Sequence, residues 1–357
     1  MIILSHTNLS GINLGGINLS EIKLGMPSGK GTGGEETFDP ASFDEAWTVT
    51  GETNDDEDRA TVKNLTGNGN DLVLSNFAFA EDSGYGEYFW NFNTWSGNSN
   101  TKPISKTSSK INIVGSASSG VWGVINHKIT GEELAVKVIV KITGLTSELP
   151  KMYFGKFDAG DMSSLLELKE GINVIDTIVN SSWGWYGFGF RKEIESCNIT
   201  IEQIPDYEGY LVTDGVDDSA RALNINLGEN FTLIGEWRLF SNTPIINAGV
   251  SLHPQLHIFN KFSDGISVSF RNVSTRLYVK TLKAICSDGR CYDDDWNDLN
   301  INVGDMISSN INTLFLGYNG TNFTKIAFKN LAIYNGKVLT KDQCISAYNY
   351  LQTLKAK

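Results

Sequence analysis

Apolar positions along this chain recur mainly with the period of a strand. In the segment 134–142 every second residue is Leu, Val or Ile, and lysines stand at two of the intervening positions. A period of two predicts a half-buried strand. Further short apolar segments follow in quick succession, at 231–239, 266–270, 277–282, 314–317 and 326–334. Strands of this length and spacing predict an antiparallel sandwich or jelly roll.

The last part of the chain changes to a helical period. Thr340-Lys-Asp-Gln343 has the form of a capping box, in which the first and last side chains satisfy each other's backbone N–H groups. Cys344, Tyr348, Leu351 and Leu354 then follow at helical spacing. We expect one C-terminal helix that packs one side against the body.

Composition agrees with a mainly β protein. The 357 residues include 36 glycines, and 11% of the residues are aromatic, which suits strands joined by tight turns. The 41 acidic residues exceed the 29 basic ones and give a formal charge of −12, which disfavours binding to nucleic acid. No run of about 20 apolar residues exists, so we expect no insertion into a membrane.

Cysteine usage indicates no disulfide framework. The chain has four cysteines, which are few for its length. Cys286 and Cys291 bracket a short polar segment and are a candidate pair that would close one hairpin. The alternative is four reduced thiols in a protein that folds in a cytoplasm.

The N-terminal segment contains a repeat of five residues. Within 8–25 the unit Ile-x-Leu recurs three times and supplies six apolar side chains: Ile12, Leu14, Ile17, Leu19, Ile22 and Leu24. Such a repeat predicts stacked β-structure, and a single coil of it cannot bury its own core. We therefore expect this arm to need a partner, either another copy of the chain or a docking surface. A glycine-rich linker, 28–34, follows it.

Two motifs resemble a known β-domain. Leu211-Val-Thr-Asp-Gly-Val-Asp-Asp218 with a following strand, and the closing segment 314–340 with its helix, are similar to laminin-G-like (concanavalin-A-type) jelly rolls. The segment 63–72, which resembles a stretch that precedes the first motif in that family, lies over a hundred residues earlier. We therefore expect an interrupted jelly roll, with its first part at 35–92, a carbohydrate-binding-module-like β-sandwich inserted at 93–204, and its main part at 205–357. Tandem domains are the alternative.

The layout also resembles virion appendage proteins of phages that infect gut Bacteroidota, including crAss-like phages. The similarity lies in the N-terminal repeats, in Asn64–Leu72 with Asn76–Phe79, and in Tyr210–Asp218. It implies a head or tail fibre, commonly a homotrimer, that attaches to a capsid or tail protein through residues 1–34. It also implies assembly in the host cytoplasm, which fits a start without the charged and apolar regions of a secretory signal. Alternatives are a capsule-glycan depolymerase and a cellular glycan-binding surface protein.

Aromatic residues are the candidate glycan-binding groups. The segment 182–190 holds Trp183 and Trp185 on one strand face, with Tyr186, Phe188 and Phe190 on the other. The two tryptophans could stack on sugar rings of a host or mucus glycan, cover a subunit contact, or belong to the core. Trp95, in the aromatic segment 89–95, is a weaker candidate of the same kind.

Clustered aspartates are candidate calcium ligands, because Ca²⁺ binds six to eight oxygens. One cluster is Asp214, Asp217 and Asp218, and a second is Asp293, Asp294 and Asp295. The alternative is solvated turns in which aspartates bond to the backbone. We expect no catalytic residues, because the carboxylate pair of jelly-roll glycosidases has no convincing match. The acidic pairs Glu132–Glu133 and Glu193/Glu195 are the nearest approach to one.

Overall fold

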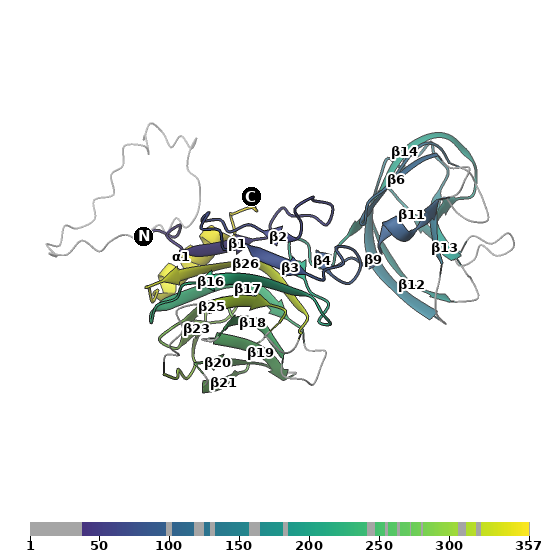
Figure 1. Cartoon of the computed structure of the whole chain (residues 1–357). Coiled ribbons are helices and arrows are strands. Elements are labelled where there is room, and N and C mark those ends of the chain that lie inside the picture. Colours follow the sequence, from purple (N-terminus) through teal and green to yellow (C-terminus); the bar gives the residue numbers. More distant parts are fainter. Residues whose placement is uncertain are drawn as a thin grey trace, which may run out of the picture. The chain divides into compact units, whose positions relative to one another are not determined.

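The computed structural model describes the chain from Phe38 to Ala356, without 98–101, 118–124, 129–132, 157–164, 181–184, 241–246, 254–255, 263–264, 272, 280, 306–311 and 319–322. Pro40–Lys357 makes one compact unit. The fold is mainly β, as predicted, with four antiparallel sheets, a short 3-10 helix (Phe92–Thr94) and one α-helix near the C-terminal end in the described ranges (Figure 1). The six apolar residues of the predicted arm lie outside the described residues.

Two of these sheets each contain eight strands and form a sandwich, called here the large sandwich. The first has the order β24 (Asp298–Asn300), β23 (Arg290–Tyr292), β22 (Ala284–Cys286), β17 (Phe231–Leu239), β26 (Ile326–Asn335), β15 (Leu211–Val212) and β4 (Gly84–Tyr85), with β1 (Glu45–Thr48) also paired to β26. The second has the order β2 (Thr61–Val62), β3 (Leu72–Ser75), β16 (Ser219–Ile225), β25 (Asn312–Leu316), β18 (Asn247–His253), β19 (Leu256–Phe262), β20 (Gly265–Phe270) and β21 (Val273–Leu277).

The other two sheets take their strands only from residues 96–204 and form the small sandwich. One has the order β12 (Gly171–Asn180), β9 (Glu133–Thr143), β14 (Ile194–Ile204), β7 (Lys110–Ala117) and β6 (Lys102–Lys106). The other has the order β11 (Leu166–Leu168), β10 (Met152–Gly155), β13 (Trp185–Phe190), β8 (Ile125–Lys128) and β5 (Ser96–Gly97). That 93–204 folds as an inserted domain stays a prediction.

Each sandwich has a hydrophobic core of its own. In the large sandwich, Leu233 and Ile333 of the first sheet and Leu314 of the second are completely buried in one cluster. In the small sandwich, the valines of β9 that the alternating pattern placed on one face are buried, while Lys137 and Lys141 are exposed. The alternation therefore assigned the faces of β9 correctly.

The C-terminal helix α1 (Lys341–Leu351) explains why the central strands of the first large sheet are buried on both faces. Its buried residues, Cys344, Ala347 and Leu351, pack toward β17 and β26. β26 is accordingly almost continuously buried along its length, as expected for a strand with a covered outer face. Thr340 and Gln343 form the predicted capping box. None of the helices in the described part of the chain has the length and apolarity needed to cross a membrane.

Two predicted boundaries are wrong. The helix ends at Leu351, so Leu354 lies beyond it, and the chain then turns until the Ala356 N–H donates to the carbonyl of Thr50 at 3.0 Å. The segment 277–282 is not one strand, because β21 ends at Leu277 in one sheet and β22 begins at Ala284 in the other. The chain crosses between sheets here, and Leu282 is apolar because it closes the core.

The candidate pair Cys286–Cys291 does not form. Within the hairpin of β22 and β23, Cys291 is opposite Ile285, and both belong to the core of the large sandwich. Cys286 is the next residue along β22, so its side chain points to the opposite face. There it lies 3.7 Å from the Leu339 carbonyl oxygen, and all four cysteines are free and buried.

Candidate functional site

The predicted aromatic platform is only partly described. Trp183 lies outside the described residues, and Trp185 is half-buried at the start of β13. Tyr186, Phe188 and Phe190, which the sequence places together on the other strand face, are at most 1% exposed and belong to the core of the small sandwich. Glycan stacking on Trp185 stays a prediction.

Trp95 is not available as a stacking surface. Its side chain is 2% exposed, and its ring centroid lies 5.1 Å from that of Trp90 and 5.7 Å from that of Phe188. A sugar ring needs an open aromatic face, but neighbouring side chains already cover the indole of Trp95. The local sequence does not reveal that this tryptophan is buried. The assignment of Trp95 to a glycan site is therefore corrected to a core position.

The first acidic cluster forms a tight turn before β16. One oxygen of each carboxylate of Asp214, Asp217 and Asp218 lies within 4.8 Å of the others. Two of their carboxylate oxygens bind the backbone of the turn: Asp214 Oδ1 accepts from the Val216 N–H at 2.7 Å, and Asp218 Oδ2 accepts from the Asp214 N–H at 2.8 Å. Such bonds shape a turn without a metal ion. Calcium binding at these residues therefore stays a prediction.

Asp218 is the unusual member of this turn. Its side chain is completely buried, and burial raises the pKa of its carboxyl group to about 6. Its proximity to Asp214 acts in the same direction, because two negative charges in one turn repel each other.

The second acidic cluster does not converge. Asp293 Oδ1 accepts from the backbone N–H groups of Asp295 and Asn297 at 3.0 and 2.9 Å, so its carboxylate closes a turn. Asp294 and Asp295 are exposed. Among the described residues, the three carboxylates at Asp214–Asp218 are the only group close enough to share one cation. Calcium at Asp293–Asp295 has no geometric support.

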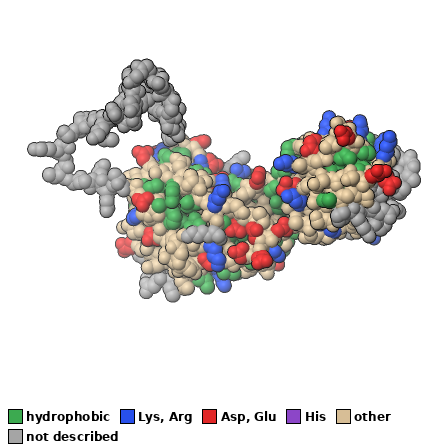
Figure 2. All heavy atoms as spheres, turned by 90° about the horizontal axis from the view of Figure 1, so that it is seen from above, with side chains coloured by type: hydrophobic (Ala, Val, Ile, Leu, Met, Phe, Trp, Pro, Cys, Tyr) green, Lys and Arg blue, Asp and Glu red, His purple; other side chains and the backbone are tan. Residues whose placement is uncertain are grey.

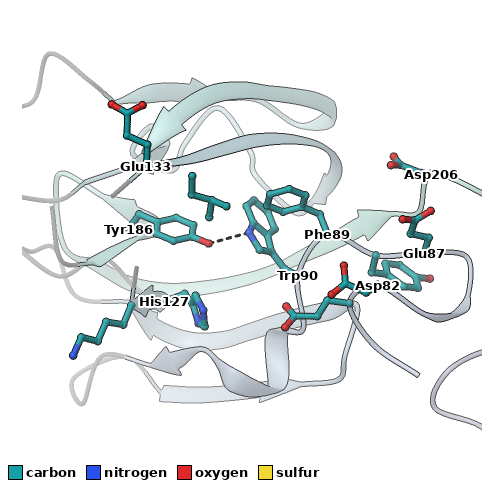
Figure 3. A pocket seen from close by; sticks show the side chains of 12 residues that line it. Asp82, Glu87, Phe89, Trp90, His127, Glu133, Tyr186 and Asp206 are labelled. Atoms are coloured by element: carbon teal, nitrogen blue, oxygen red, sulfur yellow. Dashed lines mark hydrogen bonds between the residues drawn. The ribbon is translucent and has the colours of Figure 1, made fainter. Parts of the chain in front are cut away.

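A pocket of about 390 Å³ lies at one end of the small sandwich, and we call it the aromatic–acidic pocket (Figure 3). Five segments of the chain meet there: the loop 81–90, the strands β8, β9 and β13, and the return segment at Asp206. Its aromatic side chains are Tyr88, Phe89, Trp90, His127 and Tyr186. Its carboxylates are Glu81, Asp82, Glu87, Glu133 and Asp206. The wall therefore combines flat apolar rings with hydrogen-bond acceptors.

The floor of the pocket is rigid because it belongs to the core. Trp90 is 3% exposed, and its indole N–H donates to the Tyr186 hydroxyl at 3.0 Å (Figure 3). The backbone N–H of Trp90 donates to the Gln203 side-chain oxygen at 3.0 Å, and that side chain is itself buried. These hydrogen bonds hold Trp90 in one conformation. Binding a ligand would therefore cost little conformational entropy at this side chain.

The rim of the pocket presents more accessible side chains. Phe89 is 36% exposed and meets the Trp90 ring edge-on at a centroid distance of 5.5 Å. His127 is half-buried and stacks on the buried indole of Trp95 at a centroid distance of 5.7 Å. Burial lowers the pKa of His127, and the Glu81 carboxylate opposes this effect. The imidazole is therefore mainly neutral at physiological pH.

The loop 81–90 is held in place by contacts with the return segment of the chain. The Asp206 N–H donates to the Glu87 carbonyl at 3.2 Å, and the Glu87 carboxylate forms an ion pair with Lys325. Gly86 has a φ of +105°, and a Cβ at this position would lie 2.7 Å from Pro205. Only glycine permits this close approach of the loop to Pro205.

Sequence reasoning missed most of this pocket. Phe89 and Trp90 fall in a segment that was recognised as aromatic, and Glu133 in a recognised acidic pair, but Glu81, Asp82, Glu87, His127 and Asp206 were not singled out. The available signal was the alternation of acidic and aromatic residues within 81–90. The contribution of Asp206 has no local signal, since it depends on the chain returning beside Glu87.

No protein-family model matches this chain. No curated protein matches it either.

Proposed function

We propose that this protein is a structural virion protein of a phage, a head or tail fibre, that binds a glycan of the host surface or of mucus in the aromatic–acidic pocket. The single observation that carries the binding function is the combination of exposed aromatic surface and five carboxylates around one open pocket. Sugar rings pack their C–H faces on aromatic rings, and their hydroxyl groups donate to carboxylates. The virion assignment rests on the sequence resemblance.

The buried residues at the base of the pocket support binding to a preformed site rather than to one that must open. Trp90 and Tyr186 are buried and bonded to each other, so the pocket is formed before a ligand arrives. A small open pocket gives weak binding at each site, and several copies on one particle would raise the overall avidity. A homotrimer that attaches to a capsid or tail protein through residues 1–34 would supply such copies.

Glycan binding is tested by titrating a panel of oligosaccharides and comparing Phe89→Ala with Tyr278→Ala. Phe89 lines the pocket, whereas Tyr278 is an equally aromatic residue, 73% exposed, outside it. We expect Phe89→Ala to weaken binding about tenfold or more, as loss of a stacking residue does, and Tyr278→Ala to leave it unchanged. Equal affinities of the two variants would reject the pocket as the glycan site.

The virion role is tested separately by deleting residues 1–34. We expect the truncated protein to fold and still bind glycan but to be absent from purified particles. Its presence in particles would overturn attachment through the arm. Light scattering on the full-length protein tests the trimer, and a monomeric mass would contradict it.

The same glycan panel separates a binding protein from a depolymerase. A depolymerase would release shorter products, which chromatography detects after prolonged incubation. We expect none. Product formation that Glu133→Gln abolishes would replace the adhesion proposal with an enzymatic one, because glycosidases need paired carboxylates.

A further inference from the structure

The charge of the aromatic–acidic pocket is strongly one-sided. Five carboxylates line it, and the lining contains one lysine, Lys128. A second lysine, Lys325, pairs with the carboxylate of Glu87 from outside the lining. Glu81, Asp82, Glu133 and Asp206 are exposed to solvent in the pocket or at its edge. His127 adds no compensating charge near pH 7, because burial lowers its pKa.

This imbalance exceeds that of the chain as a whole. On the face that Figure 2 shows, acidic side chains are interspersed with Lys and Arg. In the pocket the carboxylates come from three parts of the chain and surround partly apolar walls. A concave site with walls of low polarity and charges of one sign concentrates the potential inside it. A ligand that enters therefore meets a negative potential before it makes any specific contact.

The same walls suit an ammonium group that is attached to a sugar ring. The faces of aromatic side chains attract ammonium groups, and Phe89 and the half-buried Tyr88 stand beside Glu87 in the wall. Carboxylates accept charge-assisted hydrogen bonds from an amine. An anionic sugar, such as a uronic acid or a sulfated sugar, would bring its charge close to like charges.

We propose that the pocket selects a glycan with a free amino group, that is, an amino sugar that is not N-acetylated, and disfavours anionic glycans. This inference rests on the proposed glycan-binding function and specifies its ligand class. Aromatic stacking would hold the sugar ring, while the carboxylates of Asp82 and Glu133, on opposite sides of the pocket in Figure 3, would compete for its ammonium group.

The test is calorimetric titration of the full-length protein with three matched trisaccharides: a glucosamine trimer, its N-acetylated counterpart and a galacturonate trimer. At low ionic strength we expect the free-amine trimer to bind about tenfold more tightly than the acetylated one, and the uronate to bind least. Raising the NaCl concentration from about 50 mM to about 500 mM should reduce the difference by screening.

Matched variants separate charge selection from a structural effect. Asp82→Asn with Glu133→Gln removes two carboxylates of the pocket, whereas Glu148→Gln with Glu193→Gln removes two exposed carboxylates outside it. We expect the preference for the amine to fall toward equality in the first variant and to persist in the second. A damaged fold would instead weaken binding of both trimers together.

The outcomes distinguish this inference from the proposed function. Equal binding of the amine and acetylated trimers, or tighter binding of the uronate, would overturn amine selection and leave glycan adhesion in place. Failure of all three trimers to bind would also overturn amine selection. Glycan adhesion itself would fail only if the broader oligosaccharide panel gave no binding that depends on Phe89.

Discussion

The aromatic–acidic pocket and the turn at Asp214–Asp218 both gather carboxylates, but they direct the oxygens differently. In the turn, Asp214 and Asp218 accept backbone N–H groups, and Asp218 is completely buried. In the pocket, carboxylates such as Asp82 and Glu133 are exposed and stand beside aromatic rings. The number of clustered acids therefore does not indicate a ligand site. We propose that the better indicator is how many carboxylate oxygens are exposed and how many accept backbone N–H groups.

The largest effect on stability is expected at Trp95, which packs behind the residues of the pocket. Trp95→Ala removes a buried indole that packs on Trp90 and on His127. The cavity left behind should lower the free energy of unfolding by about 3–5 kcal/mol. Thermal and denaturant unfolding measure this loss. If the free energy of unfolding falls by less than about 1 kcal/mol, the indole of Trp95 is accessible rather than part of the core.

The turn should show its own pH dependence. Burial raises the pKa of Asp218 to about 6, above its ordinary value of 3.8, so folding favours the protonated form. The stabilising contribution of this carboxyl group to the free energy of unfolding is fully present below about pH 4. It is lost as the pH rises through about 6. The loss should amount to about 2–3 kcal/mol.

Asp218→Asn isolates this effect, because the amide keeps an oxygen for the Asp214 N–H but cannot ionise. The difference in unfolding free energy between the variant and the original protein should change between pH 4 and pH 7. A constant difference across that range would show that Asp218 does not titrate with a raised pKa.

The hydrogen bonds of the turn predict a smaller effect. Asp214→Ala removes the acceptor of the Val216 N–H and should lower the free energy of unfolding by about 1–2 kcal/mol. Asp214→Asn retains an acceptor oxygen and should lose less than half of this amount. Equal losses in the two variants, measured by denaturant titration, would point to the charge of Asp214 rather than to its hydrogen bonds.

Calcium offers a further way to sharpen the comparison. If the turn binds Ca²⁺ as its sequence predicts, a free concentration about fivefold above the dissociation constant should stabilise the fold by about 1 kcal/mol. Asp217→Asn, which changes an exposed member of the cluster, should abolish this increase. Mg²⁺ is the control ion, since it prefers stricter octahedral geometry. No change in melting temperature with Ca²⁺ would identify the turn as purely structural.

The smallest expected stability effect is at the pocket carboxylates. Glu133→Gln alters an exposed side chain, and the free energy of unfolding should change by less than about 0.5 kcal/mol. The same variant is expected to weaken binding of an amino sugar. Circular dichroism melting and calorimetric titration on one sample compare the two effects. A large stability loss would make Glu133 a structural residue, like those of the turn.

The pattern of the sequence predicted local elements well. The alternation in 134–142 identified β9 and its buried valines, and the capping box placed the start of α1 at Thr340. Each signal is contained in a few neighbouring residues of the chain. Predictions failed where the next element decided the outcome, as at 277–282, where the chain crosses from one sheet to the other.

The sequence by itself determined the mainly β class, the buried face of β9 and the C-terminal helix, because side-chain periodicity acts locally on the backbone. Only the tertiary structure decided which acidic and aromatic residues share a pocket. Glu87 and Asp206 meet because the chain returns beside itself after more than a hundred residues, and Trp95 is buried because distant strands supply its neighbours. Contacts of such separation depend on how strands pair and sheets stack, which the local pattern does not specify.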